Sequence, residues 1–261
     1  MTNPTHDRFS VADRTAIVTG ASSGIGRAIA EEFAADGANV VVCSREQGNV
    51  DPVAEGIREG VADGDALAVE CDVTDRDAVS ALVDATVEEF GGLDVLVNNA
   101  GASFVANFDD ISPNGWAKIL DINLTGTYNC TQVAGEHLKD GGGSVVNLAS
   151  VAGQQGAPYM SHYGAAKAAV VNLTRSLAFE WASDGVRVNC IAPGFVATPG
   201  LESQMGISAD DVAREEVERR VGVSEEIADV ARFLASPASS FVVGETVTAA
   251  GVPDVLESPE V

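Results

Sequence analysis

The chain has 261 residues, 46% of them hydrophobic, which is enough to bury the core of one α/β domain. Its charge is far from balanced, because 39 acidic residues stand against 15 basic ones and give a formal net charge of −24 at pH 7. A surface this acidic repels nucleic acid and anionic membranes, so neither is expected as a partner.

Seven apolar, β-branched segments recur along the chain, with helical segments between them. Continuous apolar runs are typical of strands covered on both faces, and regular strand–helix alternation builds a parallel sheet. The sequence therefore predicts an α/β doubly wound Rossmann fold, with a parallel seven-stranded sheet and helices on both faces. The predicted strands are Thr15–Thr19, Asn39–Cys43, Ala66–Cys71, Leu93–Val97, Ser144–Leu148, Val186–Ile191 and Glu245–Thr248.

Glycines mark the ends of three predicted helices, as expected for residues that leave a helix in a left-handed conformation. These helices are Arg27–Asp36, Asp75–Phe90 and Tyr163–Ser183, which run to Gly37, Gly91 and Gly185. Residues 8–252 are predicted to form a single domain. The polar and acidic segments 1–7 and 253–261 are expected to be tails that are flexible or make oligomer contacts.

The four cysteines, at positions 43, 71, 130 and 190, are widely separated and match no metal-binding spacing. They predict buried free thiols, and no metal site is expected. The N-terminus has no apolar leader and no stretch reaches 18 apolar residues, so we expect a soluble, cytoplasmic protein.

A glycine-rich turn follows the first predicted strand and opens a helix. It is Thr19–Gly26, with the spacing G-x-x-x-G-x-G. Glycines at such a turn let the backbone approach a pyrophosphate, and the N-terminus of the helix stabilises the anion. This spacing resembles that of the single-domain short-chain dehydrogenase/reductase family. The resemblance extends from about Asp13 to Gly251 and implies that residues 8–252 bind NAD(P).

The end of the second predicted strand bears on the choice of coenzyme. An acid there would bind the ribose 2′-hydroxyl of NAD, but this chain has Ser44-Arg45. Serine can hydrogen-bond a 2′-phosphate and arginine can pair with it, which favours NADP(H) over NAD(H). Glu46 follows directly and is the main counterargument. Asp72-Val73 resembles the family's adenine-contacting pair.

Four residues, in order along the chain, resemble the family's catalytic set: Asn123, Ser150, Tyr163 and Lys167. The i,i+4 spacing places Tyr163 and Lys167 on one face of a helix. A nearby ammonium and a positively charged nicotinamide are expected to lower the pKa of the phenol, which suits it to proton transfer. Ser150 is expected to hydrogen-bond the substrate oxygen. The resemblance assigns Asn123 to a backbone kink that holds a water against Lys167.

Further positions complete the predicted cofactor site. Asn98–Gly101 resembles the family's NNAG motif, in which small residues allow close approach and amides tie strand ends together. Pro193-Gly194 resembles its P-G turn, with Thr198 placed to bond a carboxamide. The predicted cofactor-binding residues are Gly20, Ser22, Ser23, Gly24, Ile25, Gly26, Ser44, Arg45, Asp72, Val73, Asn99, Ala100, Gly101, Tyr163, Lys167, Pro193, Gly194, Val196 and Thr198.

The expected substrate is a small carbonyl or alcohol compound. The pocket segments are mostly apolar and contain no Lys or Arg between Pro193 and Arg214, so a free phosphate or carboxylate is poorly served. A ketone, a 3-oxoacyl thioester and a neutral polyol all remain open. The candidate pocket residues are Ser103, Ala152, Gln154, Tyr159, Phe195, Val196 and the loop Pro199–Ser208, whereas His162 is expected to be structural.

The predicted function is thus an NADP(H)-dependent oxidoreductase of the ketone or 3-oxoacyl thioester reductase type. The alternatives are an NAD-dependent polyol, sugar or hydroxysteroid dehydrogenase and, outside enzymes, a dinucleotide-binding module without catalysis. The family resemblance implies a homo-oligomer, a tetramer or a dimer. The acidic composition, with only three lysines, also resembles that of proteins from extreme halophiles. Residues 248–252 replace the family's usual acidic, double-glycine ending.

Overall fold

The structure is a computed structural model, and it describes residues 7–60 and 64–253. Most of the two predicted tails, residues 1–6 and 254–261, therefore lies outside the described residues. Within them, seven strands form one sheet in the order β3-β2-β1-β4-β5-β6-β9, and every neighbouring pair is parallel. The strands are β1 (Thr15–Thr19), β2 (Asn39–Ser44), β3 (Ala66–Glu70), β4 (Val95–Asn98), β5 (Ser144–Leu148), β6 (Arg187–Pro193) and β9 (Thr246–Ala249).

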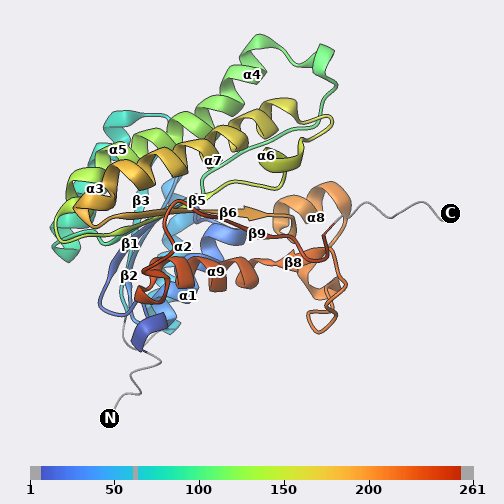
Figure 1. The fold of residues 1–261 in the computed structure, drawn as a ribbon. Coiled ribbons are helices and arrows are strands. Elements are labelled where there is room, and N and C mark those ends of the chain that lie inside the picture. Colours follow the sequence, from blue (N-terminus) through green and yellow to red (C-terminus); the bar gives the residue numbers. More distant parts are fainter. Residues whose placement is uncertain (1–6, 61–63, 254–261) are drawn as a thin grey trace.

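Helices cover both faces of this sheet, which confirms the predicted fold class (Figure 1). One face carries α1 (Gly24–Ala35), α2 (Gln47–Gly60) and α9 (Ser224–Ala235), and the other carries α3 (Arg76–Phe90), α5 (Gly126–Lys139) and α7 (Ser161–Trp181). The shorter elements are α4 (Pro113–Leu120), α6 (Ala152–Gln155) and α8 (Pro199–Met205), together with a parallel pair formed by β7 (Phe195–Ala197) and β8 (Val221–Val223).

The two hydrophobic cores explain why the strands are apolar at consecutive positions. Successive side chains of a strand point to opposite faces, and both faces of this sheet are covered. Val40 and Val42 pack with Phe33 of α1 in one core, whereas Val41 packs with Leu138 of α5 in the other. Every side chain of β1 and of β5 is buried as a result.

Helix ends agree with the predicted stop signals. Asp75 caps α3 by accepting hydrogen bonds from the amides of Asp77 and Ala78, and Gly91 ends the helix at φ 81°. Gly185 ends the segment after α7 at φ 76°. The starts of helices are less well predicted. For example, α1 begins at Gly24, inside the glycine-rich turn, and not at the predicted Arg27.

All four cysteines are free and buried, as predicted. No helix in the described parts of the chain is both long and apolar enough to span a membrane.

Candidate active site

A cavity of about 1070 Å³ opens at the carboxyl ends of the sheet strands. It lies where the strand order reverses, because β1 continues to β2 on one side and to β4 on the other. Ligands of open α/β sheets bind at such a reversal. The cavity is lined by all four predicted catalytic residues and by every predicted cofactor-binding residue except Gly26.

The glycine-rich turn brings bare backbone to the floor of the cavity. Gly20 and Gly24 have φ values of 64° and 57°, which side chains rarely adopt. A Cβ on Gly20 would also lie 2.8 Å from the Cα of Ala100. Amides at the start of α1 are therefore accessible to an anion, in a cradle that side chains would fill.

Gly26 has a packing role and does not line the cavity. A Cβ there would clash with the side-chain amide of Asn99 and would lie 2.6 Å from the carbonyl oxygen of Gly20. Gly26 thus lets α1 pass close to the end of β4. Such close helix–strand packing is the role expected of the last glycine of the motif.

The NNAG segment ties two strand ends together, as the sequence predicts. The side-chain amide of Asn99 donates to the carbonyl oxygens of Thr19 (2.9 Å) and Gly20 (3.0 Å). The hydroxyl of Thr19 accepts from the backbone amides of Asn99 and Ala100, both at 3.0 Å. These bonds fix the glycine-rich turn against β4.

One end of the cavity combines one basic and two acidic side chains with a hydroxyl group, because Ser44, Arg45, Glu46 and Asp72 line it. Burial raises the pKa of Asp72, but hydrogen bonds from Thr74 and the charges of Lys118 and Arg45 leave it below its ordinary value. Asp72 is therefore an anion at neutral pH.

Glu46 does not stand alone at this end of the cavity. Its carboxylate accepts a hydrogen bond from the side-chain amide of Asn49 at 3.2 Å, and its carbonyl accepts one from the Ser44 hydroxyl at 3.0 Å. Asn49 and Cys71 line the cavity but are absent from the predicted set. Both lie within a few residues of predicted site positions along the chain, which is the one signal that points to them.

Asn123 lies in a π-helical turn, Asp121–Thr125, that joins α4 to α5. This turn is the kink that the family resemblance implies. The side-chain amide of Asn123 donates to the carbonyl oxygens of Ala102 (2.8 Å) and Ile119 (2.9 Å). Its Oδ1 is buried and has no hydrogen-bond partner in the described part of the molecule.

Lys167 meets Asn123 beside Gly101. A Cβ on Gly101 would lie 2.8 Å from Oδ1 of Asn123 and 3.5 Å from Nζ of Lys167. The Lys167 ammonium donates to the carbonyl oxygen of Leu148 at 2.7 Å. Burial lowers the pKa of Lys167 to about 8. The unpartnered acceptor and the buried ammonium thus lie near the same bare glycine, and a water bridging them would satisfy the acceptor.

Tyr163 and Ser150 share a hydrogen bond at the cavity wall. The structure differs here from the expectation that the ammonium lowers the pKa of the phenol. Burial raises the pKa of Tyr163, and the hydrogen bond with Ser150 offsets this only in part. The Lys167 ammonium lies 5.6 Å from the centre of the Tyr163 ring and is bonded to Leu148.

The predicted substrate pocket is correct in part. Ser103, Phe195, Val196 and much of the segment from Pro199 to Met205 line the cavity. Three other predicted positions do not line it. Ala152 faces a separate groove beside α7, Gln154 accepts a hydrogen bond from Thr248 at 3.1 Å, and Tyr159 has a side chain that is 62% exposed. They are misassigned because the chain turns away after β5 through α6.

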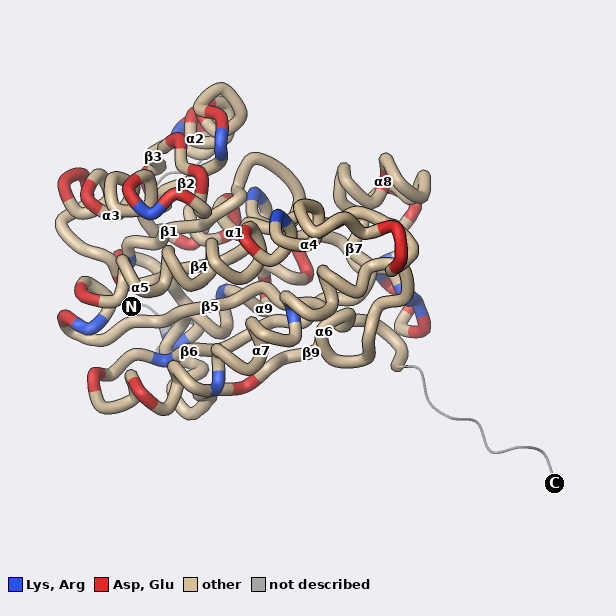
Figure 2. The backbone as a smooth tube through the Cα atoms, turned by 90° about the horizontal axis from the view of Figure 1, so that it is seen from above, with Lys and Arg blue, Asp and Glu red and all other residues tan. Residues whose placement is uncertain are grey.

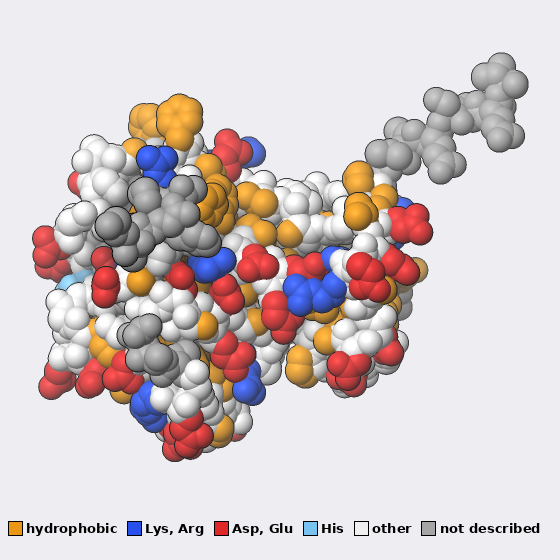
Figure 3. Space-filling view, turned by 90° about the horizontal axis from the view of Figure 1, so that it is seen from below, with side chains coloured by type: hydrophobic (Ala, Val, Ile, Leu, Met, Phe, Trp, Pro, Cys, Tyr) orange, Lys and Arg blue, Asp and Glu red, His pale blue; other side chains and the backbone are white. Residues whose placement is uncertain are grey.

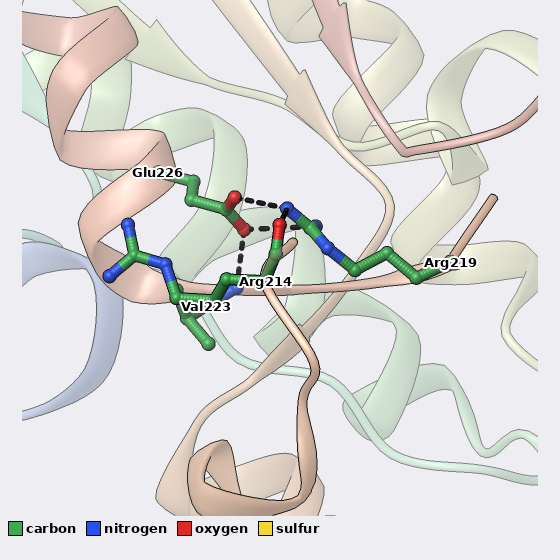
Figure 4. Close-up of polar contacts among 4 residues, drawn as sticks. All are labelled: Arg214, Arg219, Val223 and Glu226. Atoms are coloured by element: carbon green, nitrogen blue, oxygen red, sulfur yellow. Dashed lines mark hydrogen bonds and ion pairs between the residues drawn. The ribbon is translucent and has the colours of Figure 1, made fainter. Parts of the chain in front are cut away.

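One carboxylate links several residues of the segment between α8 and α9 (Figure 4). Glu226, in the first turn of α9, forms an ion pair with Arg219 and accepts from the amide of Val223 at 3.0 Å. Arg219 also donates to the carbonyl oxygen of Arg214 at 3.2 Å. The sequence analysis does not identify this link, since the partners belong to a segment with no regular pattern.

The fold and this cleft together define a dinucleotide-dependent oxidoreductase. Comparison with known proteins agrees with that class. A family model described as enoyl-(acyl carrier protein) reductase matches residues 20–251. The chain therefore belongs to the short-chain dehydrogenase/reductase family. It is an NAD(P)-dependent dehydrogenase or reductase.

Three relatives illustrate the range of this family. The chain is 44% identical to a cis-4-hydroxycyclohexanecarboxylate dehydrogenase from Sinomonas cyclohexanicum, over 89% of this chain and 93% of that one. It is 40% identical to a 3-oxoacyl-[acyl-carrier-protein] reductase from a Synechocystis strain, over 89% and 94%. A structure from Beutenbergia cavernae, provisionally described as an NAD(P)-dependent gluconate 5-dehydrogenase with bound NADP at low occupancy, superposes with a TM-score of 0.83. That chain is 38% identical, and the match covers 92% of this chain and 96% of that one.

Proposed function

We propose that this enzyme transfers a hydride between NADP(H) and a carbonyl or secondary alcohol substrate, with Tyr163 as the proton-transfer group. The observation that carries the proposal is the convergence of Ser150, Tyr163, Lys167 and Asn123 on one cavity beside a glycine cradle. The bare cradle at Gly20 and Gly24 fits a pyrophosphate, and the nicotinamide would supply the hydride when bound.

The residues of the chain handle the proton. Ser150 hydrogen-bonds the substrate oxygen together with Tyr163, so negative charge that develops on this oxygen meets two donors. Tyr163 donates its proton to that oxygen in reduction and accepts a proton in oxidation. A water held between Asn123 Oδ1 and Lys167 Nζ would return the proton to Tyr163, a role supported by the unpartnered buried acceptor.

Tyr163→Phe tests the assigned acid. Loss of the hydroxyl removes general acid catalysis, which contributes about 10²- to 10⁴-fold, so NADPH-dependent ketone reduction is expected to fall by that factor. Reduction is measured from NADPH absorbance in molar KCl, with coenzyme binding to the variant followed by fluorescence. Turnover equal to that of the wild type would refute the role of Tyr163.

The coenzyme preference rests on charge. Arg45 lines the adenosine end of the cavity, and the Glu46 carboxylate beside it accepts a hydrogen bond from Asn49. A guanidinium binds a phosphate through charge-assisted hydrogen bonds but gains much less from a ribose hydroxyl. These features favour NADP(H).

Arg45→Ala is therefore expected to weaken NADPH binding by about tenfold or more, the effect of losing a bond between charged groups, and to leave NADH binding nearly unchanged. Dissociation constants for the two coenzymes would be measured by titration of the same protein preparation. Arg27→Ala is the matched control, because Arg27 pairs with Glu31 on the surface and does not line the cavity. Equal weakening of both coenzymes by Arg45→Ala would contradict the assignment.

We also propose a homo-oligomer, a dimer or a tetramer. Support comes from the outer face of α7, where the side chain of Phe179 is 88% exposed in the single chain. Four free cysteines support a reducing compartment such as the cytoplasm.

A further inference from the structure

The two ends of the cavity differ in charge. The charged lining residues Arg45, Glu46 and Asp72 lie near the ends of β2 and β3, at the adenosine end. The other end is formed by residues 102–105, Met160 and residues 195–205. Within the described chain, these segments contribute no charged side chain to the cavity. Lys167, in the floor, is bonded to Leu148 and belongs to the catalytic set.

Phe104 forms the aromatic wall of this uncharged end. Its side chain is 37% exposed and lines the cavity. The ring packs edge-on against the imidazole of His162, with the ring centres 4.2 Å apart and an interplanar angle of 72°. On the side of α4, a Cβ at Gly115 would lie 3.2 Å from Cζ of Phe104.

The position of Phe104 is therefore set by two helices. His162 is fully buried and precedes Tyr163 on α7, so the wall and the proton donor are carried by the same turn of helix. Neither ring nitrogen of His162 has a hydrogen-bond partner among the described residues. In this position His162 serves as a packing surface for Phe104. On the other side, Gly115 has no Cβ, and an added Cβ would force the ring to shift slightly.

From these contacts we infer that the enzyme selects an uncharged carbonyl or alcohol with a bulky apolar body, and that Phe104 is the residue that sets this selection. The inference rests on the proposed function. An apolar wall favours ligand surface that leaves water, at about 25 cal/mol per Å². A carboxylate or phosphate at this end would be desolvated with no cation to pair with it.

Acidic residues stand near this end's segments in the sequence. Glu202 lies on α8 beside the lining residue Leu201, and Asp210 and Asp211 follow in the next turn. Asp109 and Asp110 are exposed a few residues beyond Phe104. The chain as a whole carries a formal net charge of −24, so an anionic carrier of an acyl group would be repelled as it approaches. We therefore expect free neutral substrates in place of carrier-bound ones.

The test compares matched substrates for the wild-type enzyme in molar KCl with NADPH. In the first pair, 4-methylcyclohexanone carries a methyl group where 4-oxocyclohexanecarboxylate carries a carboxylate. In the second pair, the same 3-oxoacyl group is joined as a thioester to neutral N-acetylcysteamine or to anionic coenzyme A. The neutral member of each pair is expected to have a kcat/KM at least about tenfold higher, because an unpaired charge is costly to desolvate. A higher kcat/KM for either anionic member, or for a keto sugar, overturns the inference.

Variants locate the selectivity. Phe104→Ala is expected to lower kcat/KM for 4-methylcyclohexanone by about 10- to 100-fold through KM, with a much smaller loss for acetone, because a full aromatic contact is removed. Gly115→Ala displaces the ring by a few tenths of an ångström. It is expected to lower the ratio of kcat/KM for 4-methylcyclohexanone to kcat/KM for acetone, by a smaller factor than Phe104→Ala does. The matched control is Phe108→Ala, which removes an equal side chain, 70% exposed, from the same segment but outside the cavity lining.

The outcomes separate this inference from the proposed function. If Phe104→Ala and Phe108→Ala change the ratio between the two ketones equally, Phe104 is not the selecting residue, even though ketone reduction persists. If no ketone, thioester or sugar is reduced while NADPH binds, the proposed function fails. Thermal unfolding of each variant checks that the change in ratio belongs to folded enzyme.

Discussion

Lys167 shows how a single buried cation is placed for chemistry at the expense of stability. It is 4% exposed, and its ammonium donates a hydrogen bond to the carbonyl oxygen of Leu148. Burial lowers the pKa of the ammonium from 10.5 to about 8. This depression corresponds to about 3 kcal/mol of destabilisation of the charged form.

Removal of this cation is expected to stabilise the fold. Below pH 8 the lysine is protonated in both the folded and the unfolded state, and the full destabilisation is present. Between pH 8 and about 10.5 only the unfolded state keeps the proton, so the wild type gains stability as the pH rises. Lys167→Met lacks that gain. At pH 7 it should be more stable by about 1 to 2 kcal/mol, because the lost bond to Leu148 offsets part of the benefit.

Denaturant unfolding of wild type and Lys167→Met at pH 7, 8, 9 and 10 checks this expectation. The free-energy difference between the two proteins should shrink steadily above pH 8. Using the difference cancels the contribution of Cys130, whose pKa is raised by burial and acts in the opposite direction. The Lys167 charge lowers the pKa of Cys190, so the contribution of this thiol belongs to the measured difference. Activity should be lost in Lys167→Met at every pH. A variant less stable than the wild type at pH 7 would contradict the assigned cost of burial.

At the level of secondary structure, the seven strands can be predicted because a sheet covered on both faces makes each strand apolar at consecutive positions. The predicted ends differ from the observed ones by one to two residues at β4 and β6 and by one residue at β2, β3 and β9, since chain flanking a buried strand is often apolar too. The short pair β7–β8 is not predictable from local pattern. It depends on residues 195–197 meeting residues 221–223, which are far apart in the sequence.

The same distinction holds within the site. The cradle and the catalytic set lie in short motifs with fixed spacing, so the sequence identifies them. Phe104 acquires its place through contacts with His162 and Gly115, from two other elements, which no local pattern records. Tyr159 is among the predicted pocket residues, but its backbone is left-handed at φ 65° and its side chain does not line the cavity.

The link between Glu226 and Arg219 is expected to hold the segment between α8 and α9. Partial burial raises the pKa of Glu226, but bonds from the Val223 amide and Arg219 outweigh it and leave the pKa lowered. Glu226→Gln is expected to lower the free energy of unfolding by about 1 to 3 kcal/mol, the range for hydrogen bonds to charged groups. Residues 206–222 should also become the first site of proteolysis.

Unfolding at pH 7 and limited proteolysis with peptide mapping test this link. The stabilisation is complete above the ordinary pKa of the carboxyl and is lost as the pH falls through its lowered value, so the two proteins should converge in acid. Glu31→Gln serves as the control. Its ion pair with Arg27 has half-exposed side chains and contributes less than about 1 kcal/mol. Equal effects of the two substitutions would show that the Glu226 link is an ordinary surface pair.

The whole molecule is governed by its charge. Acidic residues lie mainly on the longer helices and in the loops, and basic residues are sparser between them (Figure 2). The face seen from below has acidic side chains spread over most of its width (Figure 3). The 39 acidic residues outnumber the 15 basic ones by 24, and the mutual repulsion of this excess negative charge opposes compaction. We propose that the protein is adapted to high salt.

Salt is therefore expected to stabilise the fold by screening. The Debye length falls from about 10 Å at 0.1 M to about 3 Å at 1 M, which removes most repulsion between exposed carboxylates. A gain of about 2 kcal/mol would raise the midpoint of thermal unfolding by about 4 to 8 °C between 0.1 and 2 M KCl.

Sucrose at equal osmolality is the control, since it favours compact states without screening charge. The rise in the midpoint of thermal unfolding caused by potassium chloride should exceed the rise caused by sucrose most clearly at pH 7. The difference should diminish toward the isoelectric point near pH 4.2, where the net repulsion disappears. A midpoint that does not change from 0.1 to 2 M KCl would mean that the excess carboxylates are too far apart to oppose folding.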